Sequence, residues 1–232
     1  MSDRRSATNG AGARSRPAAH RYGAVFAVTL VAVVFVIAAP SGDWSRAFAL
    51  ALEFAALAIA VATSRDRVDV RRARTLAVIV VAALVVLWTG LGFLPAIGIF
   101  AIGGLLGLVI PMMLVGGLVR LLRTQGVTIQ AVAGALAIYL YVGLLFSAAV
   151  GIVGHSSSRP YFTNGSDGTQ SQRVYYSFTT MTTTGYGDFT PAMSAGRSIA
   201  VIEMLVGQLY LVTVIGILVG NMAARNRPAE PS

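Results

Sequence analysis

Long apolar runs separated by short polar segments dominate the chain. An α-helix needs roughly 20 apolar residues to cross the hydrocarbon core of a bilayer. Six runs of this kind predict membrane-spanning helices, at residues 22–39, 44–63, 75–93, 96–118, 129–153 and 197–222. A further stretch, residues 172–182, is too short to span a bilayer and too apolar and aromatic for a free loop. It predicts a helix that enters the membrane and is buried in protein.

Composition agrees with this pattern. Of the 232 residues, 56% are hydrophobic and 12% are charged, which is too apolar for a soluble domain of this size. We therefore expect an all-α membrane protein.

For residues 22–39 a cleaved signal peptide is an alternative interpretation, because a basic start precedes an apolar core. Cleavage there would leave the topology of the later spans unchanged.

The basic residues predict the orientation of the spans. All 18 are arginine, and none is lysine, a bias that we attribute to bacterial genome composition. Fourteen of them lie in the tail before residue 22, between spans two and three, after span four and after span six, which are segments on one side of the membrane. Because cytoplasmic loops are rich in Arg and Lys, we expect a multi-pass protein of the cell membrane with both termini cytoplasmic.

The densest basic segment is the loop between spans two and three. Its arginines are Arg65, Arg67, Arg71, Arg72 and Arg74. Such a loop also fits anionic lipid headgroups, so membrane lipids are expected partners there. The net charge of +9 does not indicate a nucleic-acid partner, because the arginines lie between apolar runs and form no single patch.

Little in the chain suggests enzymatic chemistry. It has no cysteine and only two histidines, His20 and His155, so neither a thiolate nor a histidine metal cluster is expected. We expect no cofactor and no enzyme activity.

The candidate chemistry lies in residues 182–188, Thr-Thr-Thr-Gly-Tyr-Gly-Asp, called the filter segment below. A filter replaces the hydration shell of an ion with oxygens, and backbone carbonyls supply them with the least bulk. Gly185 and Gly187 allow this because glycine adopts positive φ without steric cost. Tyr186 would face away and pack behind the filter, while the Thr183 hydroxyl would add an oxygen at its inner end. A simple turn is the alternative, but a short helix precedes this segment and a full span follows it.

Residues 172–222 resemble the pore of the tetrameric potassium-channel family, in its six-span, bacterial type without a charged voltage-sensing helix. Besides the filter segment, the likeness rests on Tyr175, Tyr176, Pro191, Gly196, Arg197 and Gly207. The resemblance implies ion binding at Thr183, Thr184, Gly185, Tyr186 and Gly187, with K+ held at the first four. It also implies filter support from Thr179, Thr182, Asp188 and Glu203, and a gating hinge at Gly207.

Two positions depart from the family pattern. Thr184 stands where the family usually has Val or Ile, and its hydroxyl needs a partner. Thr179 stands where some members carry a Glu that bonds the Asp after the filter, so that brace is missing.

Three residues in the spans have open roles. Glu203 would bond threonine hydroxyls such as Thr179 or Thr180, or else bind an ion. Gly207 would serve as a hinge or as a small residue that allows close helix packing. Glu53, near the middle of span two, would be a neutral or hydrogen-bonded group between helices, or a sensor.

The expected domains are a basic cytoplasmic tail, a four-helix transmembrane domain, a pore domain and a short cytoplasmic tail, at residues 1–21, 22–123, 124–222 and 223–232. The expected function is passive K+ conduction by a homotetramer, because one loop cannot encircle an ion. Span four carries no charge, so steep voltage gating is not expected. A non-conducting regulatory protein and a weakly selective cation channel are the alternatives. A potassium uptake transporter is a further alternative, but its family resemblance calls for four pore loops in one chain, and this sequence has one.

Overall fold

The computed structural model describes residues 21–39, 42–63, 78–79, 82–83, 85–86 and 96–225. Four regions named above lie outside the described residues, wholly or nearly so. They are the basic tail, the arginine-rich loop between spans two and three, most of span three and the last seven residues. What the sequence predicts for these regions stays a prediction.

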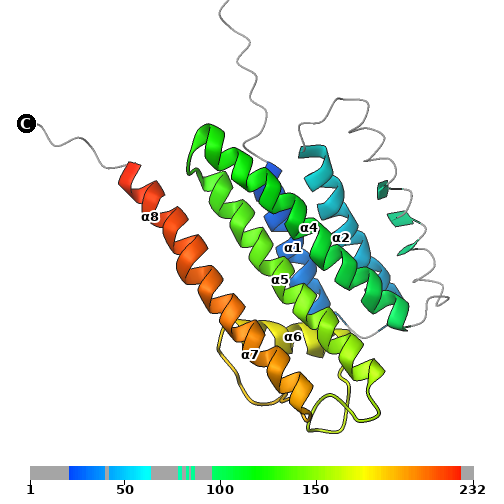
Figure 1. Ribbon diagram of the computed structural model, residues 1–232. Helices are drawn as coiled ribbons and strands as arrows, with labels where there is room; N and C mark the ends of the chain where they lie inside the picture. The colour runs from blue at the N-terminus through cyan, green and yellow to red at the C-terminus, as the bar shows by residue number, and fades with distance from the viewer. Residues whose placement is uncertain are drawn as a thin grey trace, which may run out of the picture.

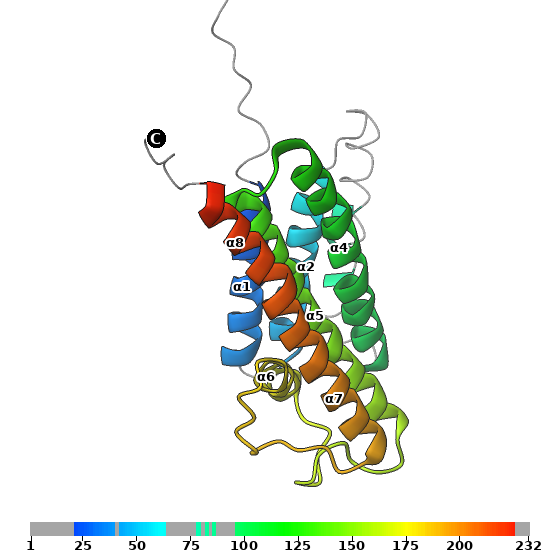
Figure 2. The same cartoon turned by 60° about the vertical axis from the view of Figure 1, so that its left-hand side comes forward.

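The described residues form helices joined by short connections. The N-terminal helices are α1 (Arg21–Ala38), α2 (Asp43–Thr63) and α4 (Ala96–Gln125), and they are followed by α5 (Ile129–Ser156) and α6 (Gln170–Met181). The last helix consists of α7 (Ser194–Leu209), η1 (Tyr210–Ile215) and α8 (Gly216–Arg225), and is called the inner helix below. No strand occurs among the described residues, and the expected all-α class is confirmed for them. In Figures 1 and 2 the long helices run side by side, and the short α6 lies across them near one end of the bundle.

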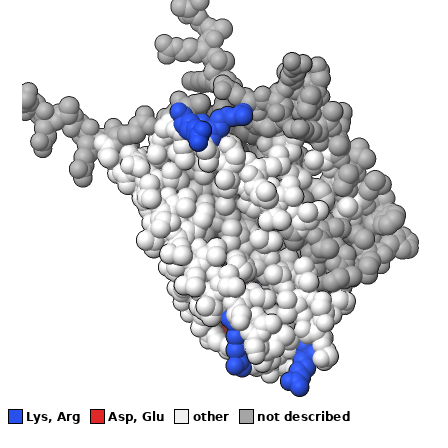
Figure 3. Space-filling view, in the orientation of Figure 1, with Lys and Arg blue, Asp and Glu red and all other residues white. Residues whose placement is uncertain are grey.

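Length and composition mark this as a membrane protein. Within the described part of the chain, three segments are long and apolar enough to cross a bilayer: Trp44–Val61, Ile129–Ser156 and Ser194–Ala224. The helix Tyr22–Ala38 is apolar but shorter. On the face drawn in Figure 3, the basic side chains lie at the two ends of the molecule, with uncharged surface between them. This distribution suits a bundle that spans a membrane, while the full count of six spans stays a prediction.

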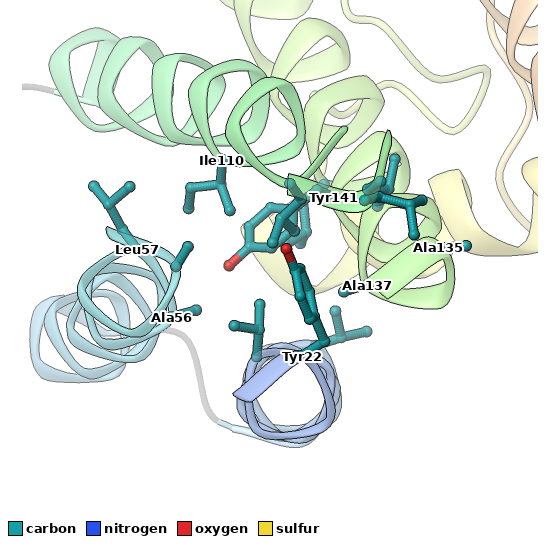
Figure 4. Packing of buried hydrophobic residues seen from close by; sticks show 14 of the residues in the cluster. Tyr22, Ala56, Leu57, Ile110, Ala135, Ala137 and Tyr141 are labelled. Carbon is teal, nitrogen blue, oxygen red and sulfur yellow. The ribbon is translucent and has the colours of Figure 1, made fainter. Parts of the chain in front are cut away.

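Small residues let the long helices pack closely. Figure 4 shows Tyr22 and Tyr141 reaching into the space between α1, α2, α4 and α5, beside Ile110. A Cβ added to Gly117 would strike the Tyr22 hydroxyl, and one added to Gly134 would lie 3.2 Å from the Tyr22 ring. In a bilayer, helices associate through such close van der Waals packing, since lipid tails are as apolar as the side chains.

The acidic residue of α2 lies inside this bundle. Glu53 is buried, and its Oε2 has no hydrogen-bond partner among the described residues. It therefore faces protein, as the cost of a carboxyl group in lipid requires.

Helix α4 is longer than the span predicted for it. The sequence suggested a span over residues 96–118, whereas α4 continues through Pro111 and ends at Gln125. Gly126, with φ of 70°, terminates it and donates its amide to the Leu122 carbonyl at 3.0 Å. Arg120 and Arg123 therefore belong to the last turns of α4, where the partial negative charge of the helix end favours cations.

The inner helix also differs from its predicted form. It begins at Ser194, three residues before the predicted start, and it contains a π-helical turn at Tyr210–Ile215. At the start of this turn the Tyr210 hydroxyl donates to the Ala135 carbonyl of α5 at 2.8 Å. The bond fixes the middle of the inner helix to α5 at the point where its winding changes.

Candidate functional site

Helix α6 positions the filter segment. Its first turn is held by a capping box, in which the Thr169 amide donates to Gln172 Oε1 at 2.8 Å and the Gln172 amide donates to Thr169 Oγ1 at 3.3 Å. This capping explains why α6 begins at Gln170 and not at residue 172. With 12 residues it is about 18 Å long, well short of a bilayer core of about 30 Å.

The backbone of the filter segment has positive φ at every second residue. The angles are 59° at Thr183, 51° at Gly185 and 81° at Gly187. The two glycines were predicted from the sequence, but Thr183 was not. A β-branched residue in this conformation is unusual and costs about 1–2 kcal/mol.

The end of α6 holds this backbone in place. The Thr183 amide donates to the Thr180 carbonyl at 2.9 Å, and the amides of Thr184 and Gly185 both donate to the Thr179 carbonyl, at 2.9 and 3.1 Å. Thr179 therefore supports the filter through its carbonyl oxygen. Its hydroxyl donates to the Tyr176 carbonyl at 3.0 Å and takes no part in the filter.

The carbonyl oxygens of the filter segment are unused. Among the described residues, none donates a hydrogen bond to a carbonyl of residues 183–187. Residues 182–188 are exposed in the single chain, and a Cβ on Gly185 or Gly187 would meet no atom within 4 Å. Free carbonyl oxygens held on a fixed backbone are the ligands that can replace water around a monovalent cation.

The hydroxyl groups of Thr182, Thr183 and Thr184, at the start of the filter segment, all have hydrogen-bond partners. Thr182 Oγ1 donates to the Phe178 carbonyl at 2.7 Å, so it can only accept in its 3.0 Å contact with Thr184 Oγ1. Thr184 thus has the partner that its hydroxyl requires. Gln208 of the inner helix donates from Nε2 to Thr183 Oγ1 at 3.3 Å. The sequence interpretation missed Gln208, whose only signal was a polar residue in an apolar run.

The aromatic side chain of the filter packs on α6. The rings of Tyr186 and Tyr175 are stacked, 6.2 Å apart between centroids and 5° from parallel. The Asp188 carboxylate lies close to the Tyr175 hydroxyl. Asp188 Oδ1 also accepts the Phe189 amide at 3.1 Å. Tyr175 is therefore a neighbour of Asp188, the residue that a Glu at position 179 would bond in some members of the family that this segment resembles.

The loop before α6 is more ordered than its polar sequence suggested. Tyr161 and Phe162 are buried and pack with Tyr176. The Thr163 amide donates to the Thr190 carbonyl at 2.9 Å, which joins the loop to the segment after the filter. The signal for this cluster was the aromatic pair inside a stretch otherwise rich in Ser, Gly and Asn.

Glu203 and Gly207 both lie next to the end of α6, and Glu203 has another neighbour than the sequence predicted. The Glu203 side chain is fully buried and bonds Ser177, not Thr179 or Thr180. Ser177 lies on the face of α6 that meets α5 and the inner helix, whereas Thr179 satisfies its hydroxyl within α6. Gly207 lies against Met181, the last residue of α6. The structure thus places Thr179, Thr182, Glu203 and Gly207 around the end of α6, next to the filter segment.

Comparison with known proteins gives one match. A family model described as an ion channel matches residues 134–223, from α5 to the last turns of α8. No curated protein and no solved structure matches the chain. The match supports an ion channel and a membrane protein, and it covers the filter segment with the helices on both sides of it.

Proposed function

We propose that this protein is a potassium-selective channel that conducts K+ passively across the cell membrane as a homotetramer. The observation that carries the proposal is the backbone of the filter segment. Positive φ alternates along Thr183, Gly185 and Gly187, and the carbonyl oxygens there are free of protein donors. K+ would bind at Thr183, Thr184, Gly185 and Tyr186, with Gly187 completing the row of oxygens.

The end of α6 adds electrostatic support. A helix C-terminus carries about half a negative elementary charge, and α6 ends one residue before the filter segment begins. Four such ends around an axis would favour a cation without supplying a full charge that would hold it too tightly.

Geometry and exposure support assembly as a tetramer. One filter segment cannot encircle an ion by itself, so closure around an ion needs copies related by a rotation axis. Tyr186 is 70% exposed in the single chain, and the inner helix exposes apolar side chains such as Leu209 and Val212. Neighbouring copies would cover these surfaces, with α1, α2 and α4 on the outside.

Flux measurements test the proposal. Purified protein in liposomes should pass K+ far faster than Na+, and its mass in detergent should be that of a tetramer. Equal K+ and Na+ flux would favour the weakly selective cation channel. Absence of any flux from a stable tetramer would favour a non-conducting regulatory protein, and a conducting monomer or dimer would overturn the proposed assembly.

A further inference from the structure

A chain of close polar contacts joins three helices directly behind the filter. Ser177 of α6 lies 2.7 Å from the Gly143 carbonyl of α5, measured from its Oγ. The same Oγ is in a short hydrogen bond with Oε1 of Glu203, on α7. Glu203 and Ser177 are both fully buried. Two residues beyond Ser177, the Thr179 carbonyl holds two filter amides.

The single hydrogen of Ser177 limits which group can donate in each of its two contacts. A serine hydroxyl carries one hydrogen, and a backbone carbonyl can only accept. The hydrogen between Ser177 and Gly143 must therefore come from Ser177. Ser177 then has no second hydrogen to give, so its contact with Glu203 is a full hydrogen bond only if a protonated Glu203 carboxyl group donates it.

The surroundings of Glu203 also favour the uncharged form. Its Oε2 is buried and has no hydrogen-bond partner among the described residues. The titratable side chains that face it are the phenols of Tyr139 on α5, Tyr161 in the loop before α6, and Tyr176 on α6. Phenols stay neutral at physiological pH and cannot offset a negative charge. A buried carboxylate without a cation or a full set of donors is unfavourable.

We propose that Glu203 is a positioning residue that acts as a protonated acid: it donates to Ser177, which donates to Gly143, and this relay ties the inner helix and α5 to the helix that carries the filter. The role in conduction rests on the proposed channel function. Ionisation of Glu203 leaves one hydrogen for two acceptors, so one contact of Ser177 must break. The end of α6 then loses a restraint, and the filter amides bonded to Thr179 and Thr180 shift with it.

Infrared difference spectroscopy tests the protonation state without any ion flux. The full-length protein should show the carbonyl stretch of a protonated carboxyl group that E203Q removes at neutral pH, and this band should disappear as the pH is raised. E53Q is the matched control, because Glu53 is a second buried carboxyl group and its substitution should leave the Glu203 band in place. A spectrum in which E203Q removes only an ionised carboxylate at neutral pH overturns the proposal.

Flux in liposomes tests the positioning role. The amide of E203Q can still donate to Ser177, so its K+ flux and its preference for K+ over Na+ should stay close to those of the unaltered protein. E203A and S177A each break the relay and should lower K+ flux about tenfold or more. The unaltered protein should lose flux over the same pH range in which the infrared band disappears, and E203Q should not.

The two measurements separate the possible failures. If E203Q loses flux as E203A does, while both remain tetrameric, the donor role of Glu203 is wrong. If E203Q keeps the alkaline loss, another group causes it and the relay is not the restraint. If the unaltered protein conducts nothing, the proposed channel function fails, while the infrared result still decides whether Glu203 is protonated.

Discussion

Gly207 of the inner helix lies directly against Met181, the last residue of α6. A Cβ on Gly207 would come within 2.5 Å of both the Met181 carbonyl oxygen and its Cγ. The carbonyl is part of the backbone that leads into the filter segment, so it cannot move aside independently. Gly207 therefore allows the inner helix to approach the filter closely, which is a packing role distinct from that of a hinge.

The first prediction follows from this contact. G207A should push the inner helix away from α6, lower the stability of the protein by about 1–3 kcal/mol and reduce K+ flux. Thermal unfolding in detergent and liposome flux measure both effects. G116A is the matched control, since Gly116 is an exposed helical glycine with no atom within 4 Å of an added Cβ. If G207A behaves like G116A in stability and changes only channel opening, Gly207 is a hinge after all.

The second prediction concerns the filter glycines. G185A and G187A should abolish the preference for K+ over Na+, because an alanine strains the positive φ of 51° or 81° that sets the carbonyl positions. G165A is the control: Gly165 also has φ of 81° and open space around it, but it lies in the loop before α6. G165A should carry a similar backbone cost of about 1 kcal/mol and keep its selectivity. A selective G187A protein would show that the backbone conformation is not what selects the ion.

Much of this site could be predicted from the sequence. Apolar runs gave the long helices, because a membrane demands nearly uninterrupted apolar segments. The glycines at 185 and 187 gave the positive-φ positions, since few other residues adopt them freely. The short apolar stretch before the filter gave α6, although its capping box at Thr169 and Gln172 set the start two residues earlier.

The contacts between elements could not be predicted. Nothing in the sequence pairs Glu203 with Ser177, since the rotation of α6 about its axis decides whether a serine or a threonine faces the inner helix. The left-handed Thr183 was missed because it depends on bonds to Thr180 and on Gln208, which lies 25 residues later. The π-helical turn at Tyr210–Ile215 likewise reflects packing of the inner helix on α5, not a local signal.

The third prediction concerns Thr184, at a position where the potassium-channel family that the sequence resembles usually has Val or Ile. T184V should keep its preference for K+, because Thr184 only donates to Thr182, which keeps its own bond to Phe178. T182V should weaken selectivity, since it removes the side-chain bond to the Phe178 carbonyl and leaves Thr184 without an acceptor, at about 1 kcal/mol for each bond. The ratio of K+ to Na+ flux in liposomes measures both. Loss of selectivity in T184V alone would give the Thr184 hydroxyl a direct role at the ion.

The last prediction is a shallow response to voltage. One charge that crosses the whole membrane field contributes about 2.3 kcal/mol per 100 mV, and steep gating needs roughly three or four such charges in each subunit. Residues 97–118 of α4 carry none, and Arg120 and Arg123 are exposed on its last turns. Other charges, such as Arg46 and Arg197, lack the regular spacing of a voltage-sensing helix.

We therefore expect the open probability to change little with voltage, and any rectification to arise in the filter, where the ions themselves cross part of the field. Gating charge measured in a planar bilayer should be small in the unaltered protein and unchanged in R120Q and R123Q, because charges at the end of α4 move through little of the field. A gating charge of several elementary charges per channel that these substitutions remove would place the voltage sensor at the end of α4.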